Sequence, residues 1–300
     1  MKQYKVAIIG NGMICNAAHI PAYKAMGDKV KIVAVADIRE EAAKETAERH
    51  GIPKYYVDPY KMLEEEKPDI ISVCTPNAYH KEYTLAGFRA GCHVVCEKPV
   101  AVTCADAEEM FNAAEKAGKH LFVIQSLRFT GNFKAAAGLA KSGCLGDIYY
   151  ADLNLVRRRG VPRWGMFHMA KENVGGAFCD LGVHMCDYLM SISGNPKMVS
   201  VSGSAVTRIV NKEKNIEFSN AESGAPTGLF TPRKFDMKEF DVEEFANGYI
   251  RLENGMTVTF KISWALNLPN SNTVSICGDK GGLTTVSYTH LRAHETLANL

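Results

Sequence analysis

The sequence has little that would mark a membrane, exported or nucleic-acid-binding protein. No apolar run approaches the roughly 20 residues that cross a bilayer, and the first residues show no hydrophobic leader or small-residue cleavage site. Charge is nearly balanced, with 35 Lys plus Arg against 33 Asp plus Glu, and the one basic cluster comprises residues 157–159 and Arg163. We therefore expect a soluble cytoplasmic protein that binds neither nucleic acid nor membrane.

The cysteines lack the spacing of a disulfide framework or a metal site. All nine are scattered, and no two form a CxxC pair. Their odd number and apolar surroundings are typical of reduced core residues in a cytoplasmic protein. His290 and His294 have metal-ligand spacing but no third ligand, so no metal is expected.

The first 125 residues alternate β-branched runs with helical patterns, which is typical of parallel strands joined by crossover helices. Strands are expected at 6–9, 32–36, 70–74, 93–96 and 121–124, and helices at 17–25, 40–50, 59–65, 81–90 and 105–117. Gly27, Gly51, Gly91 and Gly118 stand where left-handed helix caps would be. Residues 1–125 are thus predicted to form an α/β Rossmann domain with a doubly wound parallel sheet.

Residues 126–286 have a different pattern. Helices are expected near 132–141 and 180–193, an extended run at 148–156, and strands at 245–252 and 256–264 joined by a turn at 253–255. The polar stretch 211–234 is expected to be a surface excursion. This pattern predicts an α+β domain with a largely antiparallel open sheet.

A glycine-rich turn follows the first expected strand. It comprises Gly10, Asn11, Gly12, Met13 and Ile14, and it opens a helix. Gly10 permits the tight turn, Gly12 lets a pyrophosphate approach the backbone, and the helix N-terminus favours an anion. Cys15 replaces the third glycine, which governs helix packing. An ordinary glycine turn is the alternative interpretation.

Asp37 ends the second expected strand. A carboxylate there accepts hydrogen bonds from the adenosine ribose and repels a 2′-phosphate, so NAD is favoured over NADP as the cofactor. Arg39 could stack on adenine or offset a phosphate charge. Asp37 as a mere helix N-cap is the alternative.

Several motifs together resemble the GFO/IDH/MocA family of NAD(P)-dependent sugar and cyclitol oxidoreductases. They are the glycine turn, residues 74–77 with His80, Glu97-Lys98-Pro99, Gly175 and Gly176 followed by Asp180, Gly182, His184 and Asp187, and Ser263-Trp264-Ala265. The resemblance extends to about residue 286. It implies further strands and a C-terminal helix beyond that point. Residues 287–300 instead resemble the translation of a sequencing adapter, as occurs in metagenomic assemblies. We therefore expect them to be a non-native tail.

Lys98 follows the fifth expected strand, at the sheet edge where open α/β folds bind ligands. An ammonium group there can stabilise alkoxide character as a hydride leaves. The resemblance implies that Lys98 contacts both cofactor and substrate, that Glu97 belongs to the cofactor site, and that the bond into Pro99 is cis. A solvated lysine is the alternative.

Asp180 and His184 are four residues apart in a helical pattern, so they share one face, which Asp187 extends. An imidazole can take a hydroxyl proton while a carboxylate stabilises its charged form. The resemblance implies that His184 is the base, Asp180 its partner or a substrate contact, and Lys98 the third catalytic residue. A helix-surface pair is the alternative.

The remaining candidates are expected to contact the cofactor or the substrate. By similarity, Thr75, Pro76, Asn77 and His80 line the nicotinamide ribose, unless they form only a turn and a helix start. Arg157 and Trp164 suit a polyhydroxylated or acidic sugar, unless the arginine is solvated and the indole packed in the core. Arg128 is a further candidate substrate contact.

The sequence therefore predicts an NAD-dependent dehydrogenase that transfers a hydride from a secondary hydroxyl of a sugar, glycoside or cyclitol. An NAD-dependent glycosidase using transient oxidation and a non-catalytic sugar- and NAD-sensing regulator are the alternatives. The resemblance also implies a homo-oligomer, a dimer or tetramer formed through the open second-domain sheet.

Overall fold

The computed structural model describes residues 2–210, 218, 223, 228–286 and 290–295. Its described residues form two compact units. The first comprises residues 2–124, 163–174 and 228–236, and the second holds the others. Two segments expected in the second domain thus belong to the first unit. Within the described part of the chain, no helix has both the length and the apolar character needed to cross a bilayer.

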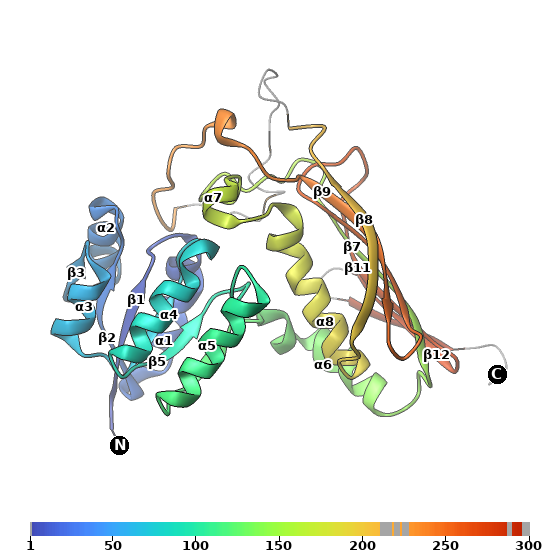
Figure 1. The fold of residues 1–300 in the computed structure, drawn as a ribbon, viewed down its shortest axis with the longest axis horizontal. Helices are drawn as coiled ribbons and strands as arrows, with labels where there is room; N and C mark the ends of the chain where they lie inside the picture. The colour runs from blue at the N-terminus through green and yellow to red at the C-terminus, as the bar shows by residue number, and fades with distance from the viewer. Residues whose placement is uncertain (1, 211–217, 219–222, 224–227, 287–289, 296–300) are drawn as a thin grey trace. The chain divides into compact units, whose positions relative to one another are not determined.

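The first unit is built on a parallel sheet (Figure 1). Its strands are β1 (Tyr4–Ile9), β2 (Val30–Ala36), β3 (Tyr55–Tyr56), β4 (Ile70–Val73), β5 (His93–Cys96) and β6 (Leu121–Val123), in the order β3-β2-β1-β4-β5-β6. The order reverses direction between β1 and β4, which is the switch point where doubly wound sheets bind ligands. Ile9 packs in the core on one face of this sheet and Ile8 in the core on the other, as a sheet covered on both faces requires.

The crossover helices of this unit are close to their expected positions. They are α1 (Ile20–Ala25), α2 (Glu40–His50), α3 (Pro59–Glu66), α4 (His80–Arg89) and α5 (Cys104–Lys116). Gly27, Gly51, Gly91 and Gly118 all have positive φ, between 58° and 80°, which confirms their predicted capping conformation.

Two local features differ from the expectation. The first helix contains a π-helical turn, η1 (Cys15–His19), ahead of α1. The two-residue strand β3 was too short for a sequence pattern to reveal. Turns of the π type are rare and frequently mark functional sites.

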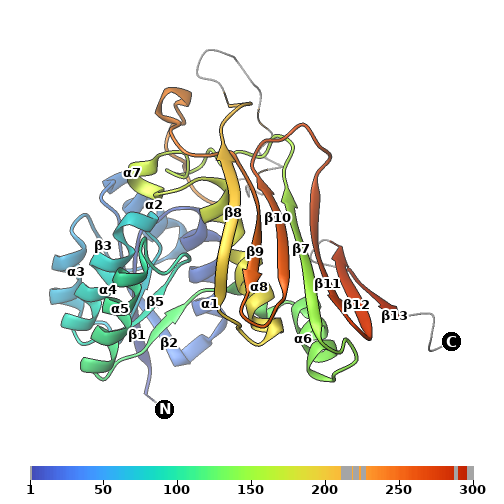
Figure 2. The same cartoon turned by 45° about the vertical axis from the view of Figure 1, so that its right-hand side comes forward.

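The second unit contains the sheet β13-β12-β11-β7-β10-β9-β8 (Figure 2). The strands are β7 (Ile148–Val156), β8 (Met198–Val206), β9 (Phe245–Leu252), β10 (Thr257–Ser263), β11 (Ser271–Gly278), β12 (Gly281–Val286) and β13 (His290–Glu295). All pairs are antiparallel except β7 with β10, so the sheet is largely antiparallel as expected.

Helices cover one face of this second sheet. They are α6 (Gly131–Lys141), the π-helical turn η5 (Phe178–Gly182) and α8 (Val183–Ser193). Phe178 contacts Phe260 of β10, and Phe133 packs edge-on against Tyr188. The other face carries polar side chains such as Asp152, Ser202 and Thr259. The oligomer expected at this sheet stays a prediction.

Two expectations fall partly outside the described residues. Of the excursion 211–234, residues 211–217, 219–222 and 224–227 are not described. Gly228 is held by Arg49, whose Nη1 donates to its carbonyl at 2.8 Å within the first unit. In the expected tail, residues 290–295 form β13, whereas 287–289 and 296–300 are not described. A non-native origin of the tail stays a prediction.

Candidate active site

The expected cofactor residues gather at the carboxyl edge of the parallel sheet. Strands β2, β1, β4 and β5 are consecutive in the sheet, so the residues that follow them are neighbours. Gly10 N donates to the carbonyl of Ala36 at 2.8 Å, and Cys74 N donates to that of Ile9, also at 2.8 Å. The parallel topology therefore assembles one site from four separate sequence motifs.

Glycine is needed at positions 10 and 12 of the turn for different physical reasons. Gly10 has φ 90°, and a Cβ there would lie 2.6 Å from the carbonyl carbon of Cys74. The turn thus needs glycine for the fold itself. A Cβ on Gly12 would meet no heavy atom within 4 Å. Packing leaves room at Gly12, which fits the close approach of a pyrophosphate to the backbone.

Asp37 organises the glycine turn through both of its carboxylate oxygens. Its Oδ2 accepts from Asn11 N at 2.8 Å and its Oδ1 from Arg39 N at 2.9 Å. Arg39 Nε lies 3.4 Å from the same Oδ1. The N-cap residue of α2 is Arg39, so the structure does not support Asp37 as that helix's cap. Asp37 instead joins the ends of β1 and β2.

Two buried polar atoms beside the glycine turn have no hydrogen-bond partner among the described residues. They are Asn11 Oδ1 and Thr75 Oγ1. Buried polar groups in native proteins are normally satisfied by protein, water or ligand. With the open space at Gly12 and the carboxylate of Asp37, these atoms fit a bound dinucleotide.

His80 lies behind the strand ends. It is fully buried, with Nε2 3.0 Å from the carbonyl oxygen of Thr75 and Nδ1 2.7 Å from that of Pro99. Burial lowers the pKa of His80, although both carbonyl contacts oppose that shift. Both ring nitrogens face backbone carbonyl oxygens, and contact of His80 with a cofactor stays a prediction. His80 holds together two segments of the site.

Asn77 also bonds to the protein, since its Nδ2 donates to the carbonyl of Asn173 at 2.9 Å. This contact ties the short helix α7 (Ala170–Asn173) to the end of β4. Thr75 and Pro76 are half-buried, as are Met13 and Ile14 at the start of the first helix. Contact of these four residues with a cofactor stays a prediction.

Glu97 is buried and bonded to the protein through both carboxylate oxygens. Oε1 lies 2.8 Å from His19 Nε2, and Oε2 accepts from Lys98 N at 3.2 Å. These bonds make Glu97 a support for its neighbours, and its contact with a cofactor stays a prediction. Lys98 is half-buried, and the Lys98–Pro99 peptide is cis, which confirms the expectation. The sequence offered no chemistry for His19.

In the second unit, Asp180 lies in η5 and His184 in the first turn of α8. Both side chains are half-buried. The indole of Trp264 is fully buried and donates from Nε1 to Asp180 Oδ2 at 3.0 Å. This bond, which the sequence did not reveal, fixes one carboxylate oxygen of Asp180.

The start of the η5–α8 segment is held by Glu243, another residue that sequence reasoning missed. Its Oε2 accepts from Gly176 N at 2.8 Å and its Oε1 from Phe178 N at 3.0 Å. A carboxylate at a helix N-terminus is favoured by the helix dipole. A Cβ on Gly176 would overlap the carbonyl oxygen of Glu243, which explains glycine at that position.

The expected substrate residues contact different protein groups within their own units. Arg128 forms a two-bond ion pair with Asp187, at 2.6 and 2.8 Å, and this pair raises the pKa of the guanidinium. Arg157 Nη1 donates to the carbonyl of Gly160 at 3.3 Å. Trp164 packs edge-on against Phe167 in the first unit, whereas Arg157 belongs to the second. Substrate contact by any of them stays a prediction.

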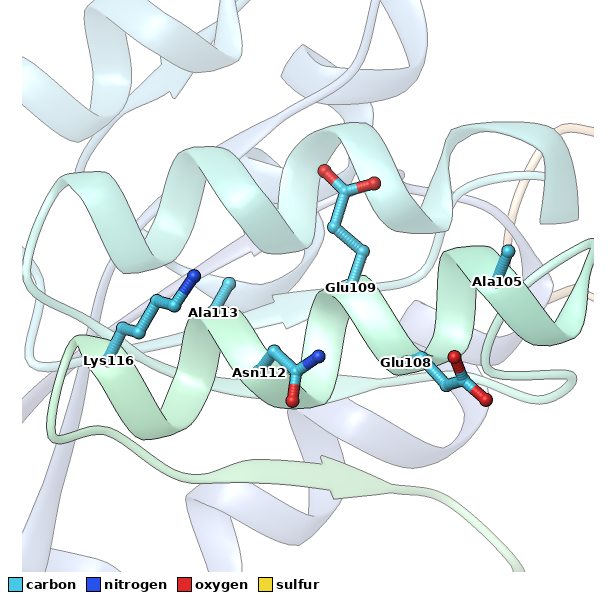
Figure 3. Close-up of a pocket in the computed structure, with 6 residues that line it drawn as sticks. All are labelled: Ala105, Glu108, Glu109, Asn112, Ala113 and Lys116. Atoms are coloured by element: carbon cyan, nitrogen blue, oxygen red, sulfur yellow. The ribbon is translucent and has the colours of Figure 1, made fainter.

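A shallow depression on α5 is separate from the candidate site, since none of the expected site residues lines it. Figure 3 shows that its lining residues, among them Glu108, Asn112 and Lys116, all come from that one helix. Glu109 there bonds to Lys81 at 2.6 Å. Among the described residues, no group of three or more His, Cys, Asp or Glu side chains could hold a metal ion.

The comparison with known proteins agrees with this architecture. Residues 4–125 match the oxidoreductase family with an NAD-binding Rossmann fold, and residues 133–284 match the GFO/IDH/MocA C-terminal domain. The chain belongs to the GFO/IDH/MocA family. It is thus an NAD(P)-dependent dehydrogenase with an NAD-binding Rossmann domain.

Individual members of the GFO/IDH/MocA family match over different lengths. A D-glucoside 3-dehydrogenase of Escherichia coli (strain K12) is 36% identical over 282 residues, 93% of this chain and 76% of the relative. A myo-inositol 2-dehydrogenase of Thermotoga maritima is 30% identical over 190 residues, which span 63% of this chain and 55% of the relative. The crystal structure of an oxidoreductase domain protein from Kribbella flavida shares the fold, with TM-score 0.81, 23% identity, and coverage of 99% and 78% of the two chains.

Proposed function

We propose that this protein oxidises a secondary hydroxyl of a sugar, glycoside or cyclitol, with NAD as the hydride acceptor. The observation that carries the proposal is the carboxyl-edge site, where Asp37, the glycine turn, Thr75 and Lys98 follow the neighbouring strands β2, β1, β4 and β5. The similarity to a D-glucoside 3-dehydrogenase and a myo-inositol 2-dehydrogenase supports this substrate class.

Each proposed catalytic residue has one task. The Lys98 ammonium donates a hydrogen bond to the substrate hydroxyl oxygen and stabilises the negative charge that develops as the C–H bond breaks. His184 accepts the hydroxyl proton, and Asp180 stabilises the imidazolium that results. Loss of the hydroxyl proton to His184 and of a hydride from the same carbon would leave a carbonyl. NAD, when bound, supplies the hydride acceptor.

The test measures NADH formation with a panel of inositols, hexoses, uronates and glycosides, with NADP compared in parallel. Lys98→Ala and His184→Ala should still bind NAD but lose about 10²- to 10⁴-fold in turnover, as expected for removal of a group that moves or stabilises a proton. Lys81→Ala is the matched control, because that lysine bonds to Asp106 and Glu109 on the helix surface. Wild-type turnover in either active-site variant would contradict the mechanism.

The same assay separates the two alternatives. A glycosidase that oxidises its substrate transiently would release the aglycone without net NADH, whereas a dehydrogenase accumulates NADH. A sensing regulator would bind NAD and sugar with no turnover of either.

A further inference from the structure

A buried chain of hydrogen bonds connects η1 to the segment that carries Lys98. Tyr23 OH lies 2.7 Å from Ser72 Oγ, which lies 3.1 Å from His19 Nδ1. His19 Nε2 lies 2.8 Å from Glu97 Oε1, and Lys98 N donates to Glu97 Oε2 at 3.2 Å. This series of hydrogen bonds starts in the helix behind the glycine turn and ends at the backbone of the proposed catalytic lysine.

The side chains that form this series of hydrogen bonds are buried. His19 and Glu97 are each 7% exposed, and Ser72 is fully buried. A buried hydrogen-bonded pair is a poor source of stability, because the cost of removing its polar groups from water largely cancels the gain from the bond. Such a pair has value when it fixes the geometry of groups that must be held closely, as in an active site.

We propose that His19 is a positioning residue for catalysis: it fixes the Glu97 carboxylate, which in turn holds the Lys98 segment at the end of β5. The inference rests on the proposed role of Lys98. It assigns a function to a histidine that contacts neither the glycine turn nor the expected substrate residues in any described bond. His80 supports the same segment from its other side, through the Pro99 carbonyl.

The electrostatics give His19 a measurable effect. Burial alone would raise the pKa of Glu97, but the bond and charge of His19, with the charge of Lys98, hold it below its ordinary value. The other titratable groups that interact with this carboxylate are His80, Cys74 and Cys96. Burial raises the pKa of both thiols, which therefore stay neutral. Without His19, Glu97 should bind a proton at a higher pH.

The experiment compares turnover across pH in the full chain. His19→Leu should lose about 10- to 100-fold in kcat, as a misplaced catalytic group does, with the loss deepening as the pH falls while KM for NAD changes little. His19→Gln, whose amide can still donate to Glu97, should recover part of kcat. Glu97→Gln should lower kcat without that pH dependence. Cys92→Ala, at the other end of β5, is the control for a lost buried contact and should keep the wild-type profile.

Infrared difference spectra give a readout that needs no turnover. As the pH is lowered, His19→Leu should show a protonated carboxyl band at a pH where wild type and the His19→Leu/Glu97→Gln double variant lack it. An unshifted pH profile in His19→Leu, or the absence of that band, would overturn the inference. Absence of dehydrogenase activity in wild type would refute the proposed function instead, and the infrared result would still decide whether His19 controls Glu97.

Discussion

At the scale of single residues, Gly10 and Gly12 separate the needs of the fold from those of the ligand. Gly10→Ala would force a Cβ into a strained backbone at φ 90° and to within 2.6 Å of Cys74. We expect it to lower the free energy of unfolding by at least about 2 kcal/mol. Gly12→Ala meets no protein atom, so its stability should stay within about 0.5 kcal/mol of wild type.

Gly12→Ala should weaken NAD binding although it leaves the stability of the protein nearly unchanged. Because the open side of Gly12 is where a pyrophosphate would approach, we expect Gly12→Ala to weaken NAD binding about tenfold or more, a loss of about 1.4 kcal/mol. Denaturant unfolding and NAD titration of the two variants check both expectations. Unchanged NAD affinity in Gly12→Ala would contradict the placement of the pyrophosphate.

Asp37 is the residue that should select the coenzyme. Asp37→Ser removes the charged acceptor, and a hydrogen bond to a charged group contributes about 1.5–3 kcal/mol. We expect kcat/KM for NAD to fall about 10- to 100-fold. NADP should lose less, because the repulsion of its phosphate disappears. Steady-state kinetics with both coenzymes give the ratio, which separates this effect from a general loss caused by the broken bond to Asn11.

At the scale of elements, the η5–α8 segment depends on a single carboxylate from a distant loop. Glu243→Gln keeps the shape of the side chain but removes its charge and one of its two acceptors for Gly176 N and Phe178 N. We expect a loss of about 1–3 kcal/mol, measured by denaturant unfolding, with kcat reduced because Asp180 and His184 lie on that segment.

The matched control for that variant is Glu253→Gln. Glu253 also accepts from a backbone N–H, that of Lys197 at 2.9 Å, but it is exposed and lies at the β9–β10 turn. It should change stability by less than about 0.5 kcal/mol and leave kcat unaltered. Equal effects of the two variants would mean that Glu243 has no special role at the helix start.

At the scale of the whole molecule, the shifted groups predict lower stability in acid. Burial lowers the pKa of His80 below its ordinary value of 6.5, so the unfolded chain binds a proton that the folded chain refuses. Glu97 is also held below its ordinary 4.5, by His19 and Lys98 against the effect of burial. Each group therefore contributes stability at a pH above its pKa in the unfolded chain. This contribution is lost as the pH falls below that pKa.

Thermal unfolding across pH checks this expectation. The Tm should start to fall near pH 6.5 and fall further near pH 4.5, by about 2–4 °C for each kcal/mol lost. His80→Gln should be less stable at neutral pH but show a flatter Tm profile in the upper window. The Tm should still depend on pH to some extent in this variant, because the pKa values of His50 and His93 are also lowered, mainly by burial. A Tm that rises on acidification would contradict the assignment.

The features that depend on local sequence pattern could be predicted before the structure was known. The alternation of β-branched runs with helical segments gave the doubly wound sheet, and glycine caps such as Gly51 marked the helix ends, because these signals arise from neighbouring residues. The motifs at the strand ends were recognisable for the same reason, since parallel topology carries such residues to one edge.

The side chains that support the site became evident only in the folded chain. Glu97 and His80 were expected at the cofactor, yet both are turned to the protein, one toward His19 and the other toward two carbonyl groups. The bonds of Glu243 to Gly176 and of Trp264 to Asp180 join residues 67 and 84 positions apart. No local pattern encodes such pairs, because they exist only after packing has brought distant elements together and removed water from between them.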